Sequence, residues 1–177
     1  MTTPLTETGA GRMAILTAMP AEAAALLEEL GPDADRVEHG RRIFTFGSLR
    51  GVPVVVVVAR CGKVAAATTV TELIVRFGVE RVICTGVAGG LGAEVAIGDV
   101  VVADRLVQHD LDPRPLWPRH VVPLLETGFF PTDAELTDRL VEAARRFEAG
   151  GEGGRVHRGL IASGDQFIHG PSMGDAV

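Results

Sequence analysis

The sequence is poor in several residue types, and each shortage excludes a class of protein. Only two cysteines, Cys61 and Cys84, occur among 177 residues, which is too few for a disulfide framework or a zinc site. We expect both to be buried free thiols in a reducing compartment. Basic residues are outnumbered by acidic ones, 17 to 23, and they are dispersed apart from short pairs such as Arg41-Arg42. This balance argues against a nucleic-acid surface, which needs a basic stripe.

Long hydrophobic runs and targeting segments are also missing. The two longest apolar runs, residues 52–59 and 82–90, are far shorter than the roughly 20 residues that span a bilayer. Residues 1–12, MTTPLTETGAGR, lack the apolar core of a signal peptide. We therefore expect a disordered leader over 1–12, one domain over 13–177, a cytoplasmic location and no contact with membranes.

The remaining chain alternates short apolar runs with helical patterns, and its hydrophobic content of 46% suits a globular protein. Val54–Val58 is a run of five valines, which indicates a central strand covered on both faces. The pattern predicts an α/β fold, a single domain with a mixed central β-sheet flanked by helices. Strands are expected at 13–17, 43–46, 54–59, 81–85, 99–107 and 156–162, and helices at 21–30, 63–77 and 133–147.

Helical spacing also predicts which faces are buried. In the second helix the apolar face is formed by Val70, Leu73, Ile74 and Phe77, and in the third by Leu136, Leu140, Val141 and Ala144. Gly78 is expected to end the second helix, and the stretch GSLRG predicts a hairpin turn between two strands.

A cluster of glycines lies between two strand-like runs in VICTGVAGGLGAEVAIGDVVV, residues 82–102. A dinucleotide site would need Gly-x-Gly-x-x-Gly leading into a helix. Here the glycine spacing differs and the chain runs into another strand. Gly62-Lys63 also lacks the rest of a P-loop motif. What remains is a stretch of bare main chain, which suits either a flat, ring-shaped ligand or a tight turn and nothing more.

Four segments in order resemble the nucleoside phosphorylase and nucleosidase family, and within it most of all the methylthioadenosine/S-adenosylhomocysteine nucleosidases. These segments are AILTAMPAEAAALL, CGKVAAATTV, TGVAGGL with IGDVVVAD, and GLIASGDQFIHG. The resemblance covers the chain from about Met13 onward. It implies the nucleoside phosphorylase-like fold and hydrolysis of the N-glycosidic bond of an adenine nucleoside in nucleoside salvage, with no metal and no other cofactor.

The resemblance also implies roles for single residues. Glu22 matches the acidic residue that positions and deprotonates the attacking water. Without the motif, the simpler interpretation is a solvated glutamate that the helix dipole favours in the first turn. The substrate-binding positions implied are Met19, Val87, Ala88, Gly89, Phe167 and Ile168, where Phe167 stacks on the purine and Met19 faces the ribose. Core packing is the alternative for Met19, Phe167 and Ile168.

Family members form homodimers in which a loop of the neighbour closes the site, and LDPRPLWPRH with Trp117 is the candidate loop. A surface loop or a core segment would explain it equally well. The nearby HDLD stretch, with His109, Asp110 and Asp112, has metal-ligand residue types, but we expect hydrogen-bonding loop residues there.

Two departures from the family pattern bear on the function. Val87 replaces the serine common in nucleosidases, and because phosphorylases use that neighbourhood for phosphate, it weakens a phosphate site. Family members also continue through a Glu-Met-Glu segment that grips the ribose and a Ser-Asp that protonates the adenine. This chain reaches PSMGDAV, where we expect a helix to begin, so we expect the domain to be C-terminally incomplete. The alternatives are a nucleoside phosphorylase, for which Arg60 alone is thin evidence of a phosphate site, and a non-catalytic nucleoside-binding remnant.

Overall fold

The computed structural model describes residues 11–151 and 153–168. The chain folds into two compact units, and the division between them falls after Ala88. Most of the expected leader, and the expected start of a helix after residue 168, lie outside the described residues. No helix in the described part of the chain is long and apolar enough to cross a membrane.

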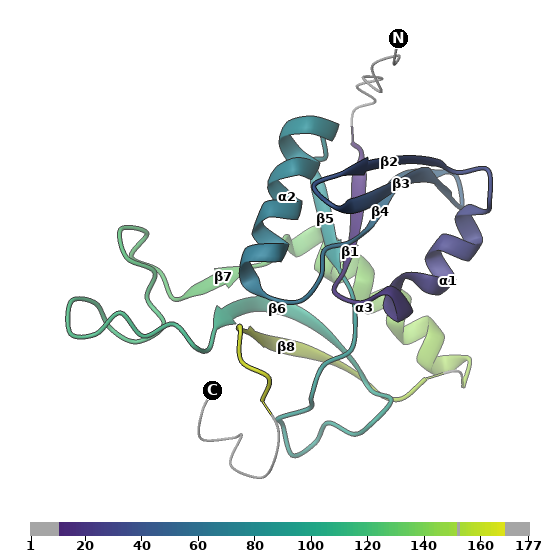
Figure 1. Ribbon diagram of the computed structural model, residues 1–177. Helices are drawn as coiled ribbons and strands as arrows, with labels where there is room; N and C mark the ends of the chain where they lie inside the picture. Colours follow the sequence, from purple (N-terminus) through teal and green to yellow (C-terminus); the bar gives the residue numbers. More distant parts are fainter. Residues whose placement is uncertain (1–10, 152, 169–177) are drawn as a thin grey trace. The chain divides into compact units, whose positions relative to one another are not determined.

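The first unit is a five-stranded sheet with two helices (Figure 1). Its elements are β1 (Met13–Thr17), α1 (Pro20–Leu30), β2 (Asp35–His39), β3 (Arg42–Leu49), β4 (Val52–Val58), α2 (Lys63–Phe77) and β5 (Arg81–Cys84). The strand order is β2-β3-β4-β1-β5. Strands β4, β1 and β5 are parallel, whereas β2, β3 and β4 form an antiparallel meander. The predicted mixed sheet is confirmed in this unit.

The two helices lie on opposite faces of this sheet, as Figure 1 shows. Alternate residues of β4 therefore enter different cores. Val55 and Val57 pack with Leu73 and Phe77 of α2, while Val54 and Val56 pack with Ala23 of α1. The valine run is buried on both faces, so the prediction of a covered central strand is confirmed.

Several local features differ from the sequence-based expectations. Strand β2 was not predicted because its sequence, DRVEH, is polar and only partly buried. On α2 the buried face contains Thr69 in place of Ile74, whose side chain is 53% exposed. The Thr69 hydroxyl donates to Ala65 O within the helix, which removes the cost of burying it. Gly78 ends α2 in the left-handed conformation, as predicted.

The prediction that both cysteines are buried is wrong. Cys61 and Cys84 are free thiols and both are exposed. Cys84 is the last residue of β5, an edge strand of the sheet, and Cys61 lies in the turn that precedes α2. Each cysteine lies at or next to the end of a strand or helix, where adjacent segments of the protein cover a side chain only in part.

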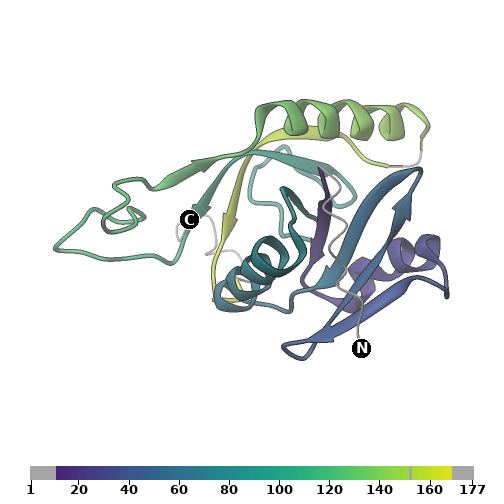
Figure 2. The same ribbon diagram turned by 90° about the horizontal axis from the view of Figure 1, so that it is seen from above.

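The second unit is a three-stranded sheet with one helix. Its elements are β6 (Val100–Gln108), β7 (Phe129–Pro131), α3 (Ala134–Ala149) and β8 (Val156–Ser163), in the order β7-β6-β8. Strands β6 and β8 are parallel, and β7 is antiparallel to β6. The short strand β7 was not predicted. Helix α3 packs on β6 and β8, and the segment between β6 and β7 extends beyond the end of this sheet (Figure 2).

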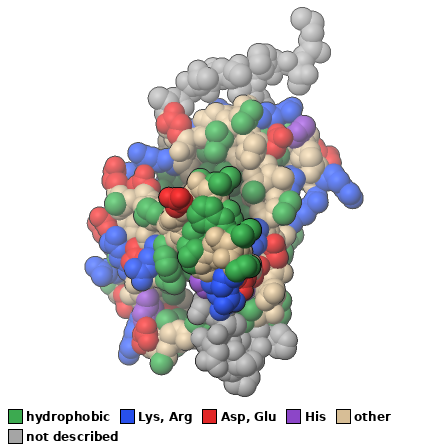
Figure 3. Space-filling model, turned by 90° about the vertical axis from the view of Figure 1, so that its left-hand side faces the viewer, with side chains coloured by type: hydrophobic (Ala, Val, Ile, Leu, Met, Phe, Trp, Pro, Cys, Tyr) green, Lys and Arg blue, Asp and Glu red, His purple; other side chains and the backbone are tan. Residues whose placement is uncertain are grey.

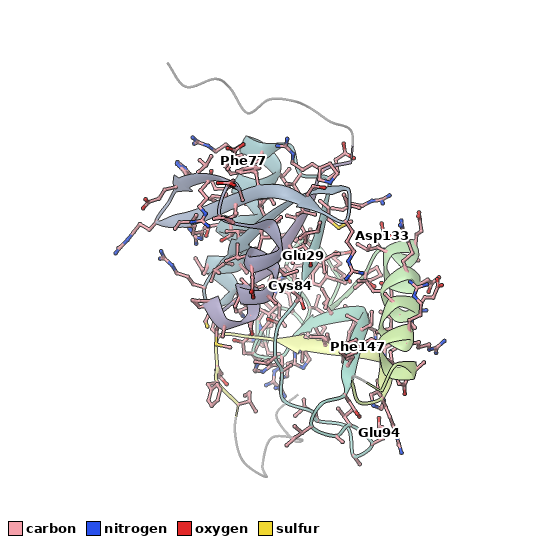
Figure 4. All side chains as sticks on the ribbon, turned by 90° about the vertical axis from the view of Figure 1, so that its right-hand side faces the viewer. Glu29, Phe77, Cys84, Glu94, Asp133 and Phe147 are labelled. Carbon is pink, nitrogen blue, oxygen red and sulfur yellow. The ribbon has the colours of Figure 1, made fainter. Side chains whose placement is uncertain are left out.

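Helix α3 begins where its sequence predicts. The Asp133 side chain accepts a 2.8 Å hydrogen bond from the Leu136 amide and so caps the helix. Figure 4 shows Asp133 at the amino end of α3 and Phe147 near its carboxyl end. Val141 is buried, and Leu136, Leu140 and Ala144 are half-buried, which confirms the predicted apolar face.

Asp99 connects the start of β6 to the start of β8. Its carboxylate accepts hydrogen bonds from the Ala96 amide at 3.0 Å and the Arg155 amide at 2.8 Å. It also contacts the His157 ring at 2.8 Å. The Ala96 amide and the His157 ring outweigh desolvation and lower the pKa of Asp99 to about 2. The ionised carboxylate is therefore the form that the folded unit favours.

We predict that Asp99→Asn lowers the Tm by a few degrees at pH 7 and that this difference disappears as the pH approaches 2. The folded-state pKa lies below the ordinary value of 3.8. The contribution to stability is therefore present above that value and is lost as the pH falls through about 2. Thermal unfolding followed by circular dichroism from pH 7 to pH 2 measures it. Asp33→Asn, at an exposed aspartate, is the control, and equal effects of the two changes at pH 7 would contradict the assignment.

Candidate active site

The Glu22 carboxylate lies at the carboxyl ends of β1 and β5 and accepts hydrogen bonds from three backbone amides. Its Oε2 accepts from the amides of Ala18 and Met19, each at 2.9 Å. Its Oε1 accepts from the Val87 amide at 3.0 Å. The carboxylate thus joins the loop after β1 to the segment after β5, two parts of the chain that are 65 residues apart.

Local sequence explains why Glu22 takes this position. Pro20 begins α1, as its fixed φ angle favours, and Glu22 is the third residue of the helix. From there a glutamate side chain reaches back to the amide of the N-cap residue, Met19, which is half of a capping box. The Val87 amide is within reach because β1 and β5 pair directly, a pairing that the bond from the Thr85 amide to Leu16 O extends.

The surroundings of Glu22 keep it ionised and leave it one open acceptor position. Desolvation raises the pKa of Glu22, but the amides of Val87, Met19 and Ala18 together outweigh it, so the pKa is below the ordinary 4.5. A carboxylate has about four lone-pair positions, and three of them are used. The fourth remains for a water molecule or a hydroxyl group of a ligand.

The main chain after β5 is bare around this carboxylate. A Cβ atom on Gly86 would lie 2.6 Å from Glu22 Oε1 and 2.8 Å from Cδ, so only glycine allows the carboxylate to approach. The Val87 side chain is 78% exposed, and Ala88 is exposed as well. Met19, whose amide donates to the other carboxylate oxygen, Oε2, is 38% exposed. Four predicted site residues, Met19, Glu22, Val87 and Ala88, are thus brought together in the first unit.

The other predicted site residues belong to the second unit. Gly89 is exposed at its start. Phe167 follows β8 and is 90% exposed, and Ile168 is half-buried, so core packing does not explain Phe167. Trp117 is half-buried in the segment between β6 and β7.

The Ser-Gly-Asp stretch that precedes Phe167 packs against the end of β6. The Asp165 amide donates to Asp110 Oδ2 at 2.8 Å, and the His109 amide donates to Ser163 O at 3.0 Å. A Cβ on Gly164 would overlap the ring of His109, which is buried. These contacts fix the direction in which the chain leaves β8.

The HDLD stretch consists of hydrogen-bonding loop residues, as expected. Asp112 accepts from the Arg114 side chain at 2.7 Å and 2.5 Å, and that hydrogen bonding lowers the pKa of Asp112 to about 2. Among the described residues no three His, Cys, Asp or Glu side chains gather in a way that could hold a metal ion.

Sequence reasoning missed a cavity of about 430 Å³ in the first unit that four arginines line. The arginines are Arg36, Arg41, Arg42 and Arg60. Arg41 and Arg42 are neighbours in the sequence, and pairing of β2, β3 and β4 brings Arg60 to the same end of the sheet. One sequence signal could have pointed to this cavity, namely Gly40-Arg41 between two strands. A two-residue turn there places Arg41 beside the end of one strand and the start of the next.

Comparison with known proteins identifies the family. A family model described as the phosphorylase superfamily matches residues 12–175. The 5′-methylthioadenosine/S-adenosylhomocysteine nucleosidase of Mycobacterium bovis is 38% identical over 173 residues, covering 88% of this chain and 67% of the relative. The aminodeoxyfutalosine nucleosidase of Helicobacter pylori is 34% identical over 165 residues, covering 89% and 66%. The chain thus spans about two-thirds of the length of these relatives.

Solved structures agree. A mutant of the Helicobacter pylori nucleosidase with 5′-methylthioadenosine in its active site superposes with a TM-score of 0.84 at 32% identity, covering 94% of this chain and 70% of that one. The Neisseria meningitidis nucleosidase with methylthio-immucillin-A superposes with a TM-score of 0.82 at 34% identity, covering 93% and 69%. The predicted nucleoside phosphorylase-like fold class is confirmed, and the chain belongs to the phosphorylase superfamily.

Proposed function

We propose that this protein hydrolyses the N-glycosidic bond of an adenine nucleoside of the methylthioadenosine or S-adenosylhomocysteine type and releases adenine. One observation carries the proposal: an ionised carboxylate, Glu22, is fixed by three amides beside exposed, bare main chain. The relatives support it: the one from Mycobacterium bovis is a nucleosidase of methylthioadenosine and S-adenosylhomocysteine, and the one from Helicobacter pylori is a nucleosidase of aminodeoxyfutalosine.

In the proposed reaction, the C1′–N9 bond breaks and its electron pair leaves with the purine. Water oxygen bonds to C1′, and one water proton passes to Glu22, which later releases it to solvent. The departing adenine takes up a proton from solvent. The pKa of Glu22 is low, so the carboxylate first accepts a hydrogen bond from neutral water. It takes the proton only as the C–O bond forms and the water becomes acidic.

The other residues of the proposal bind the substrate. The exposed main chain at Val87 and Ala88, with Gly89, forms the floor under the ribose and base, and Met19 faces the ribose. Phe167 stacks on the purine, and the Ile168 main chain bonds its edge. The exposure of the Phe167 ring supports this role, because a stacking side chain must present one face of its ring to the ligand.

We predict that Glu22→Gln lowers the rate of adenine release from methylthioadenosine by about 10²–10⁴, because the amide cannot accept the proton. The rate for the unchanged protein should need no phosphate. It should fall only below pH 4.5, since the pKa of Glu22 is lowered from that value. Adenine release is followed by chromatography, with Glu28→Gln on the exposed side of α1 as the control. Unchanged turnover in Glu22→Gln would contradict the role, and turnover that requires phosphate would select a phosphorylase.

We predict that Gly86→Ala lowers the same rate by about 10², because the added Cβ would displace the Glu22 carboxylate by contact at 2.6 Å. Gly92→Ala is a matched control in the same glycine cluster. Its Cβ would meet only the end of the Glu94 side chain, which is exposed and able to move. Equal rates of adenine release for the two variants would contradict the claim that catalysis depends on the position of the Glu22 carboxylate.

We further propose that the protein is a cytoplasmic homodimer in which the segment around Trp117 closes the partner's site. The free thiols of Cys61 and Cys84 are in keeping with a reducing compartment. The segment between β6 and β7 exposes several large apolar side chains, which are Leu116, Leu124 and Leu125. Figure 3 is viewed from the left-hand side of Figure 1, where this segment lies. Hydrophobic side chains gather in the middle of the face that it shows.

We predict that Leu116→Glu converts the dimer to a monomer, because the 85% exposed Leu116 side chain would be buried between protomers. Light scattering after gel filtration measures the mass. Ile97→Glu, at a fully exposed position outside the segment, should leave the dimer intact. A monomeric unchanged protein, or a dimer that survives Leu116→Glu, would reject the proposal.

A further inference from the structure

The chain that leaves β8, yellow in Figure 1, carries two of the proposed substrate-binding residues, Phe167 and Ile168. Residues 165–167 are exposed, so burial contributes little to holding them in place. A ring that stacks on a ligand has to be held beforehand, because ordering a loose segment on binding costs conformational entropy and lowers the affinity. Contacts other than core packing must therefore fix the direction of this segment.

Hydrogen bonds join the segment to the end of β6. The pairing of β6 with β8 runs as far as Gln108 and Ser163, and the His109 amide adds one more bond by donating to Ser163 O at 3.0 Å. Beyond it, the Asp165 amide donates to Asp110 Oδ2 at 2.8 Å. The two chains therefore stay joined for two residues past the end of the sheet.

Gly164 lies between these two hydrogen bonds and against the side chains of His109 and Asp110. A Cβ atom on Gly164 would overlap His109 Nε2 and would lie 2.9 Å from Asp110 Cγ. The φ angle of Gly164 is outside the left-handed region, so this position needs the absence of a side chain and not the backbone freedom of glycine. His109, Asp110, Gly164 and Asp165 are called here the β8 exit turn.

The His109 side of the exit turn is the firm side. The His109 ring is buried, and its carbonyl accepts from Arg119 Nη2 at 3.4 Å. The preceding carbonyl, that of Gln108, contacts the His120 ring at 3.0 Å. A side chain at position 164 would therefore displace the exposed chain after β8 and not the buried ring. Since non-bonded carbon atoms pack about 3.5 Å apart, the displacement would be about 1 Å.

We propose that Gly164 and Asp110 are positioning residues for purine binding. Through the exit turn they hold the Phe167 ring in the direction that stacking needs and the Ile168 main chain in the place from which it bonds the purine edge. Neither residue contacts the purine itself. The proposal rests on the proposed function, and every residue of the exit turn belongs to the same unit as Phe167 and Ile168.

The first test measures the affinity for free adenine by calorimetry. Gly164→Ala should weaken adenine binding about tenfold to a hundredfold, which corresponds to the loss of one stack of a base on an aromatic ring. Gly159→Ala is the matched control in β8, because a Cβ there would meet no atom within 4 Å, and it should bind adenine as the unchanged protein does. Equal affinities of these two variants for adenine would overturn the proposal.

A double-mutant cycle distinguishes positioning from a general loss of structure. Phe167→Ala alone should weaken adenine binding by a similar factor, about tenfold to a hundredfold. If Gly164 acts through Phe167, then adding Gly164→Ala to Phe167→Ala should weaken binding by less than about twofold further. Effects of the two substitutions that multiply fully would contradict the positioning role, because a merely structural glycine would act independently of the ring.

Two substitutions of Asp110 test the hydrogen bond to the Asp165 amide. Asp110→Ala removes the acceptor and should weaken adenine binding about tenfold, the effect expected of a hydrogen bond to a charged group. Asp110→Asn keeps an acceptor oxygen and should stay within about threefold of the unchanged protein. An alanine variant that binds adenine as well as the asparagine variant does would reject the role of Asp110.

Hydrolysis of methylthioadenosine, measured on the same samples, separates this proposal from the proposed function. If the unchanged protein hydrolyses the nucleoside but the cycle is additive, the positioning role fails alone. If adenine binds and the cycle is non-additive but no hydrolysis occurs, the proposed reaction fails and the positioning role stands. If adenine does not bind and no hydrolysis occurs, both are overturned.

Discussion

The three hydrogen bonds to the Glu22 carboxylate are the interaction on which the candidate site depends. They join the loop after β1 to the segment after β5. Two of the donors, the amides of Ala18 and Met19, lie just before α1, and the third is the Val87 amide. The bonds hold the carboxylate in one place, keep it ionised and leave part of it open. A charged group that is already fixed loses little freedom when a substrate binds, and this preorganisation is what acid–base catalysis requires.

The bare main chain around the carboxylate follows from the same constraint. Gly86 has no room for a Cβ because the Glu22 oxygen is there. Two further glycines of the cluster have other neighbours: a Cβ on Gly90 would meet Val95 at 3.0 Å, and one on Gly92 would meet Glu94. The cluster therefore serves both close packing and an open surface, and neither a ligand floor nor a tight turn alone accounts for it.

Much of the fold could be predicted from local sequence. Strong signals, such as the five valines of β4 and the helix-ending Gly78, gave the right elements because local preference and tertiary packing agree there. The polar strand β2 and the short β7 were missed because pairing with a neighbour, and not their own composition, makes them strands. The amide contacts of Glu22 and the cavity lined by Arg41 and Arg60 depend on pairing between distant segments. No local pattern reports such contacts, so only the family motifs pointed to Glu22.

A crystal structure of the protein with a methylthioadenosine analogue, one that the enzyme cannot hydrolyse, tests the central claim most directly. The account predicts that Glu22 keeps its bond to the Val87 amide and that the carboxylate's remaining lone pair accepts from a water molecule or ribose hydroxyl next to C1′. The ring system would then lie on the main chain at Val87 and Ala88. An analogue bound away from Glu22, with the carboxylate turned into solvent and its amide contacts broken, would contradict the account.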